Sequence, residues 1–92
     1  MIEYDFTPQG VCASAIHVEL DDAGSTIERV SFEGGCNGNL KAVSKLVAGQ
    51  PVKRVVDLLE GNTCGRRSTS CADQLTRALS EAAAKAQAKA QA

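Results

Sequence analysis

The sequence contains few aromatic residues and no long apolar run. Aromatic side chains make up 3% of the 92 residues, and tryptophan is absent. Proteins that bind single-stranded nucleic acid stack bases on aromatic rings, and the net charge of -1 offers no basic field to attract phosphates. No segment reaches the roughly 20 apolar residues that a membrane-spanning helix needs. We therefore expect neither a nucleic-acid partner nor a membrane partner.

Basic residues are missing from the first ten positions, MIEYDFTPQG, which carry two acids. A secretory signal peptide begins with a basic segment followed by an apolar one, so we expect a cytoplasmic location. Four cysteines in that reducing compartment favour metal binding or redox chemistry over structural disulfides. In an exported protein the same cysteines would allow three disulfide pairings, between which the sequence does not choose.

Three segments in the first third of the chain alternate apolar and polar residues with the period of a β-strand. They cover residues 2–6, 11–20 and 26–33, and the polar loop before the third contains Gly24, which suits a hairpin turn. We expect a three-stranded antiparallel meander. On its second strand, one face is expected to carry Cys12, Ser14, Ile16, Val18 and Leu20, and the other face Ala15, His17 and Glu19.

Apolar residues spaced three and four apart predict three helices after the strands, over residues 39–49, 50–61 and 68–92. Gly49 and Gly61 are expected to end the first two. The stripes comprise Leu40, Val43 and Val47; Val52, Val55, Val56 and Leu59; and Leu75, Leu79 and Ala82. Packing these helices on one face of the sheet gives an α+β fold.

The third helix is expected to begin with a capping box formed by Ser70 and Asp73. Beyond residue 82 its apolar stripe gives way to Ala, Lys and Gln, which favour helix but bury nothing large. We therefore expect one domain over residues 1–82 and an exposed helical tail over residues 83–92.

The four cysteines follow the spacing C-x23-C-x27-C-x6-C, which lacks the C-x2-C pairs of a zinc finger. Their surroundings are more informative. With the hairpin loop centred near Gly24, Cys12 lies opposite Gly34, Gly35 or Cys36. Cys36 stands just before a helix, with Asn37 as the expected N-cap, and Cys71 lies in the first turn of another helix. Helix N-termini stabilise a thiolate through free N–H groups and the helix dipole.

These placements predict one site at which the four sulfurs meet. The metal ligands would be Cys12, Cys36, Cys64 and Cys71, and the site would hold zinc or an iron–sulfur cluster. The glycines of the segment FEGGCNGN would let the backbone wrap around the site. Residues expected to contact the bound group are Gly35, Asn37, Gly38 and Arg66.

Other interpretations of the same residues stay open. Each cysteine could be a small buried apolar residue, and Cys64 and Cys71 could form a disulfide across six residues. Arg66 and its neighbour Arg67 fit a solvated basic loop as well as a thiolate contact. His17, beside Glu19 on the polar strand face, is expected to be solvated and not a ligand. No arrangement of a nucleophile and a base is evident, so an enzymatic activity is not favoured.

The segments GGCNGNLKAVSKLVAGQPV and TCGRRSTSCADQL resemble the TSCPD-domain family in its stand-alone four-cysteine form. The resemblance runs from about Tyr4 to Leu79 and departs at Ala72, where the family motif has proline. It implies a metal site at the four cysteines and a relation to the C-terminal domain of cobalamin-dependent ribonucleotide reductases. A fainter similarity to U-type iron–sulfur scaffold proteins matches Cys12, Cys36 and Cys71 but not Cys64.

The leading hypothesis is a small metal-binding module that serves a larger enzyme, such as a ribonucleotide reductase. One alternative is a thiol–disulfide redox protein that uses Cys64 and Cys71. Another is a module that binds a small anion at the helix N-terminus after GGCNGN. An exposed strand edge would also let two copies pair as a homodimer.

Overall fold

The computed structural model describes residues 1–11, 13–35, 37–62 and 69–91. Three strands, β1 (Ile2–Phe6), β2 (Ala13–Leu20) and β3 (Ile27–Gly34), form one open antiparallel sheet in the order β1-β2-β3. Three helices follow, α1 (Asn37–Val47), α2 (Val52–Leu59) and α3 (Cys71–Gln91). The predicted α+β arrangement is confirmed. None of the helices in the described ranges is both long and apolar enough to span a membrane.

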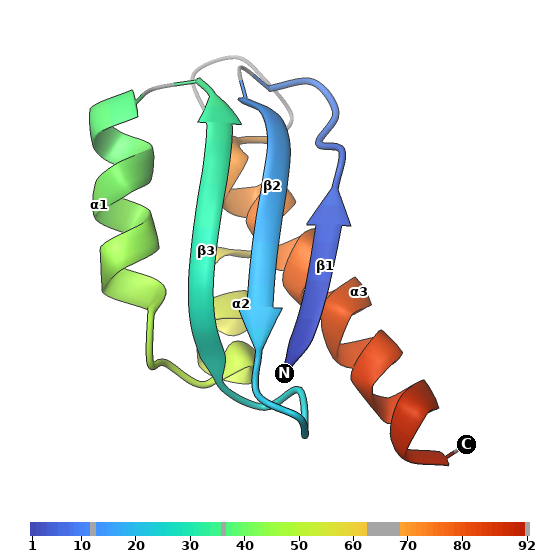
Figure 1. The fold of residues 1–92 in the computed structure, drawn as a ribbon. Helices are drawn as coiled ribbons and strands as arrows, with labels where there is room; N and C mark the ends of the chain where they lie inside the picture. The colour runs from blue at the N-terminus through green and yellow to red at the C-terminus, as the bar shows by residue number, and fades with distance from the viewer. Residues whose placement is uncertain (12, 36, 63–68, 92) are drawn as a thin grey trace.

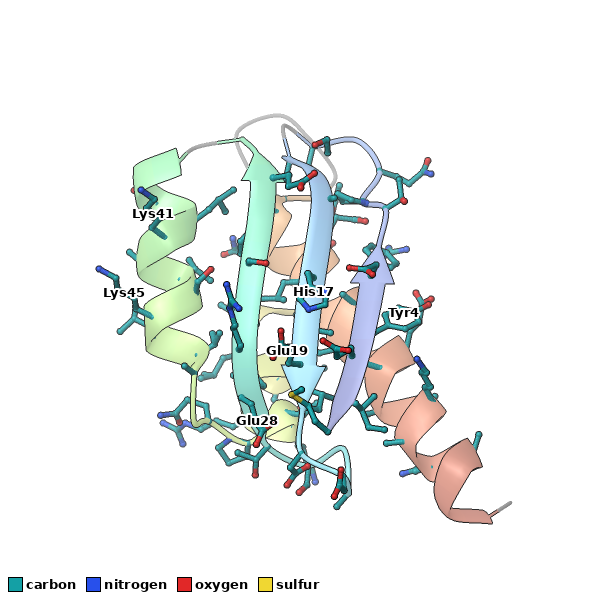
Figure 2. The ribbon with its side chains drawn as sticks, in the orientation of Figure 1. Tyr4, His17, Glu19, Glu28, Lys41 and Lys45 are labelled. Atoms are coloured by element: carbon teal, nitrogen blue, oxygen red, sulfur yellow. The ribbon has the colours of Figure 1, made fainter. Side chains whose placement is uncertain are left out.

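The three helices lie at different places relative to the sheet. In Figure 1, α2 and α3 lie behind the strands, whereas α1 runs alongside the free edge of β3. The centre of the core lies between β2 and α3, where Ile16, Val18, Leu20, Leu75 and Leu79 are completely buried. The core is thus aliphatic, as the scarcity of aromatic residues predicts. Among the described elements, no helix covers the outer face of the sheet, where Figure 2 shows His17 and Glu19 (Figures 1 and 2).

The pairing of β2 with β3 follows the register predicted from the hairpin loop. Val18 pairs with Val30, and Ala13 pairs with Gly34. A β-bulge between Ala13 and Ala15 interrupts the alternation. The prediction that Ser14 shares the buried face of Ile16 is therefore wrong: Ser14 is exposed and Ala13 is buried. An inserted residue exchanges the two faces of a strand, which period-2 patterning does not reveal.

The end of the sheet that carries the β2–β3 turn is fastened by backbone hydrogen bonds. Ile27 donates its N–H to Gln50 O at 2.9 Å, and Gly49 donates to Ile27 O at 2.7 Å. Gly24 has a φ of +73° and packs against α3, since a Cβ placed on it would lie 2.6 Å from Ala86 Cβ. Ala86 is buried, so the docked part of α3 extends beyond the predicted start of the tail at residue 83.

Candidate metal centre

Only part of the predicted ligand set lies in the described ranges. Cys71 is the first residue of α3 and is partly buried. Cys12, Cys36, Cys64 and Arg66 lie outside the described residues. The residues that adjoin these positions along the chain are described, and their contacts define the surroundings of the predicted site.

The residues next to Cys12 and Cys36 lie together where β2 begins and β3 ends. Ala13 pairs with Gly34 across the two strands. Gly35 has a φ of +77°, and a Cβ on it would lie 3.2 Å from Ala13 N and 2.8 Å from Leu40 Cδ1. A larger residue would have to displace the Leu40 side chain and shift the backbone at Ala13 slightly, and the positive φ is itself unfavourable for it. Both the close contacts and the backbone conformation therefore favour glycine at position 35.

The start of α1 differs slightly from the prediction. Asn37 is the first residue of the helix, so its predicted role as the N-cap is wrong by one position. Gly38 follows in the first turn, and a Cβ placed on it would meet nothing within 4 Å. Steric crowding therefore explains the glycine at position 35 but not the one at position 38.

The start of α3 contains one half of the predicted capping box and a set of contacts that was not predicted. Asp73 donates its N–H to Ser70 Oγ at 3.1 Å, as in a capping box, but its carboxylate bonds other residues in place of the Ser70 N–H. The Asp73 carboxylate accepts hydrogen bonds from Thr69 Oγ1 and from Gly61 N at 2.8 Å. These two hydrogen bonds lower the pKa of Asp73, and the one from Thr69 has the larger effect. One buried carboxylate thus links the two sides of segment 62–68.

Ser70 also connects the two ends of the segment between α2 and α3, through two hydrogen bonds to Asn62. Its hydroxyl donates to Asn62 O at 2.5 Å, and Asn62 Nδ2 donates back to Ser70 Oγ at 3.4 Å. Residues 62 and 70 flank the range that contains Cys64. Cys71 follows Ser70 directly, so both ends of this range adjoin the start of α3.

Gln74 connects the segment before Cys12 to the start of α3. Its side chain is buried, and its Oε1 accepts a hydrogen bond from Gln9 N at 3.1 Å. Its Nε2 donates to Thr69 Oγ1 at 3.0 Å. Gly10 lies against Thr69 as well, because a Cβ on Gly10 would be 3.6 Å from Thr69 Cγ2. Residues 9 and 10 are thereby held beside the residues that precede Cys71.

All these contacts gather at one end of the sheet, opposite the β2–β3 turn (Figure 1). We call it the cysteine end and define it by the described residues 9–11, 13, 34–38, 61–62 and 69–74. Of the described residues at this end, the sequence pointed to Gly35, Gly38 and Cys71, but it gave no indication of the tertiary contacts of Asp73 and Gln74. The available signal was their position two and three residues after Cys71 in the segment TSCADQL.

A model of the TSCPD domain family matches residues 2–83 of the chain. No curated protein and no solved structure matches it. The matched range includes all four cysteine positions and every residue of the cysteine end.

Proposed function

The chain belongs to the TSCPD-domain family, and we propose that it is a metal-binding module whose four cysteines hold one zinc ion or one iron–sulfur cluster. The ligands are Cys12, Cys36, Cys64 and Cys71. Gly35, Asn37, Gly38 and Arg66 surround the bound group. The structure describes the surroundings of three of these eight residues, Gly35, Gly38 and Cys71. For Asn37 it describes the backbone.

The observation that supports the proposal is that described neighbours of the four cysteine positions lie at the cysteine end. Ala13, the neighbour of Cys12, lies against Gly35, the neighbour of Cys36. Ser70, the neighbour of Cys71, is hydrogen-bonded to Asn62 at the edge of the range with Cys64. Adjacent Cα atoms are only about 3.8 Å apart. We therefore propose that the cysteines, each one or two residues from one of these described neighbours, meet in the same region.

The donor set fits the group. Four thiolates are soft ligands, which select zinc or iron–sulfur clusters over magnesium and calcium. The first turns of α1 and α3 both begin at the cysteine end, and their free N–H groups favour the negative charge of a thiolate cluster. When bound, the metal would cross-link four segments that are far apart in the sequence. For a structural zinc ion, this contributes on the order of 10 kcal/mol to folding.

We assign the module an accessory role to a larger enzyme, such as a ribonucleotide reductase, as the resemblance of the family implies. The described surface offers support for a protein partner. Leu46 of α1 and Leu58 of α2 are 74% and 68% exposed, and they line a mainly apolar groove between the two helices. Large exposed apolar side chains that share one groove are typical of protein-binding surfaces.

A second candidate is a thiol–disulfide redox protein that uses Cys64 and Cys71. The hydrogen bonds between Ser70 and Asn62 favour it, because they close the segment that separates the two cysteines. The two candidates differ in what they need. A redox pair uses two cysteines and no metal, whereas a metal centre uses all four.

The test is to purify the full chain anaerobically without a chelator and to measure bound metal, free thiols and the absorption spectrum. We expect about one zinc per chain with no visible absorption, or iron and sulfide with charge-transfer bands. Each single Cys→Ser variant should lose most of the metal, including Cys12→Ser and Cys36→Ser. Metal-free protein that forms a reversible disulfide between Cys64 and Cys71 alone would establish the redox candidate instead.

A further inference from the structure

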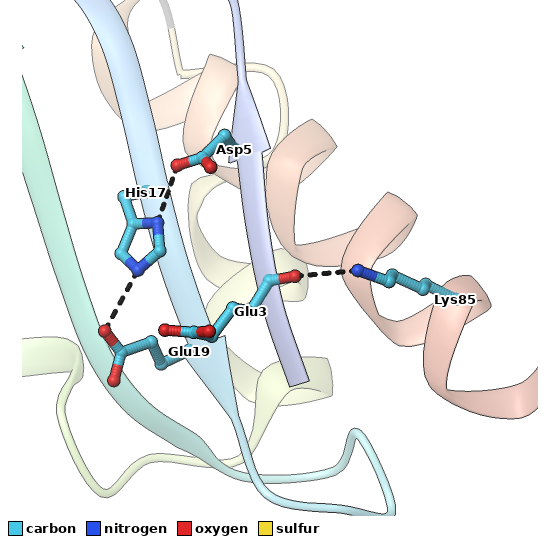
Figure 3. A network of polar contacts seen from close by, with 5 residues as sticks. All are labelled: Glu3, Asp5, His17, Glu19 and Lys85. Atoms are coloured by element: carbon cyan, nitrogen blue, oxygen red, sulfur yellow. Dashed lines mark hydrogen bonds and ion pairs between the residues drawn. The ribbon is translucent and has the colours of Figure 1, made fainter. Parts of the chain in front are cut away.

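The outer face of the sheet carries four titratable side chains in a compact group. Glu3 and Asp5 come from β1, and His17 and Glu19 from β2. The strand register places Glu3 directly opposite Glu19, and Asp5 directly opposite His17. Figure 3 shows the four side chains on the side of the sheet that faces away from α3.

The histidine ring is held between two carboxylates. His17 Nδ1 lies 2.6 Å from Asp5 Oδ1, and His17 Nε2 lies 2.9 Å from Glu19 Oε2. A carboxylate only accepts hydrogen bonds, so a positive charge is needed to satisfy both ends of the ring. Two arrangements provide it. The imidazole is protonated on both nitrogens, or Asp5 accepts a hydrogen bond from Nδ1–H while a cation binds between Nε2 and Glu19.

The negative charge of this group is poorly compensated. Like charges directly opposite each other on neighbouring strands destabilise a sheet, and Glu3 and Glu19 form such a pair. Lys85 Nζ donates to the backbone oxygen of Glu3 and not to its carboxylate (Figure 3). Arg29 stands opposite Glu19 in the β2–β3 register. Nevertheless, within the described ranges no Lys or Arg forms an ion pair with Glu3, Asp5 or Glu19.

The ligand atoms lie close to the spacing that one ion requires. One ligand atom from each of Glu3, His17 and Glu19 can be chosen so that all lie within 4.8 Å of one another. Around a tetrahedral zinc ion such atoms are about 3.4 Å apart. Glu3 is exposed and free to rotate inward, while Glu19 and His17, with side chains 15% and 29% exposed, are already confined.

We propose that Glu3, His17 and Glu19 form a second, open binding site for a divalent transition-metal ion such as zinc on the outer face of the sheet. His17 Nε2 and one oxygen from each glutamate are the ligands, and water completes the coordination. Asp5 is a positioning residue: its carboxylate accepts the Nδ1–H bond and holds the imidazole with Nε2 toward the ion. The ion also removes the repulsion between the paired glutamates.

The experiment uses the full chain as purified, with whatever the cysteines hold left in place, and titrates it with zinc chloride. The chain has one histidine, so its ring proton signals in the NMR spectrum report on His17 alone. We expect these signals to shift and to saturate at one added zinc per chain. Two variants should weaken zinc binding by about tenfold or more. One is Glu3→Gln, at an exposed position, and the other combines Glu3→Gln with Glu19→Gln.

Matched variants make the result specific. Asp5→Asn should weaken zinc binding about 10- to 100-fold while the stoichiometry stays at one, as expected for a residue that only orients a ligand. Glu33→Gln, an exposed carboxylate on β3 outside the group, should change nothing. Ring signals that stay unshifted up to millimolar zinc would overturn the proposal, as would equal binding by the Glu3→Gln, Glu19→Gln double variant and the Glu33→Gln control. The metal content of the Cys→Ser variants is a separate readout, so failure here leaves the cysteine centre untouched.

Discussion

The two ends of the sheet are held together in different ways. The end with the β2–β3 turn uses backbone hydrogen bonds, such as those between Ile27 and the turn at Gly49 and Gln50, and the close contact of Gly24 with Ala86. The cysteine end uses side-chain hydrogen bonds, chiefly those of Ser70, Asp73 and Gln74, to hold the described parts of its loops. Both ends join segments that are far apart in the sequence. They differ in the kind of contact that does so: backbone hydrogen bonds and close packing at the turn end, and side-chain hydrogen bonds at the cysteine end.

This difference bears on where the proposed metal would act. Backbone ladders and apolar contacts hold the turn end, whereas the described segments of the cysteine end are joined by a few side chains and lose conformational entropy when they are ordered. A metal ion that binds one ligand from each segment, as proposed, would offset that loss. We therefore expect the stability of the cysteine end to depend on metal, and four changes test this contrast between the two ends.

Removal of the metal should have the largest effect. A strong chelator applied under reducing conditions is expected to lower the free energy of unfolding by an amount on the order of 10 kcal/mol. Most of a small domain's stability would then be lost, since totals of about 5–15 kcal/mol are usual. Urea unfolding with and without chelator measures this. Identical curves would mean that the side-chain hydrogen bonds suffice at the cysteine end.

At the other end, Gly24→Ala should be the most damaging single change. The new Cβ would clash with Ala86, and the φ of +73° is unfavourable for alanine. Strain and overpacking together are expected to cost about 2–4 kcal/mol. Gly49→Ala is the matched control, because it shares the strained φ of +82° but has open space around the Cβ, and should cost about 1–2 kcal/mol. Thermal or urea unfolding gives both values, and equal losses would contradict the packing of Gly24 on α3.

Asp73→Ala tests the side chains that fasten the cysteine end. It leaves the N–H of Gly61 without its partner and releases Thr69, so we expect a loss of about 1–3 kcal/mol and weaker metal retention against a chelator. Glu60→Gln, at an exposed neighbouring position, serves as the control. Stability lost with metal retention unchanged would show that Asp73 supports the helix start alone and not the site.

Asp21→Asn should have the smallest effect and should depend on pH. Hydrogen bonds from the backbone N–H groups of Ser25, first, and Thr26 lower the pKa of Asp21 in the folded protein. Because this pKa is lowered, the ionised carboxylate stabilises the folded protein at pH values above the usual aspartate pKa of 3.8. That stabilisation is lost as the pH falls through the pKa of Asp21 in the folded protein. The difference in unfolding free energy between the two proteins should therefore shrink between about pH 5 and pH 3. A difference that is constant with pH would refute this role of the charge.

The sequence was a good guide to features that repeat locally. Alternation located the strands, spacing of three and four located the helices, and the loop at Gly24 set the register that pairs Ala13 with Gly34. Each of these depends on neighbours in the chain, whose period is visible in the residue order. The stripe of α3 was also correct at Leu75 and Leu79.

The features that the sequence did not reveal depend on distant parts of the chain. The bulge at Ser14, the burial of Ala86 under Gly24 and the contacts of Gln74 with Gln9 arise only once β2, α3 and the first loop are in place. His17 was expected to be solvated, but its ring nitrogens meet Asp5 and Glu19. Small residues and single polar side chains carry no periodic signal, so tertiary contacts decide their roles.

The most direct test is X-ray absorption spectroscopy at the edge of the metal that remains bound after anaerobic purification. For zinc, we expect a first coordination shell of four sulfur atoms at about 2.3 Å, and for iron a shell of cysteine and sulfide sulfur. A first shell made mainly of nitrogen and oxygen would contradict a four-cysteine centre, as would a chain that holds no metal and has four free thiols.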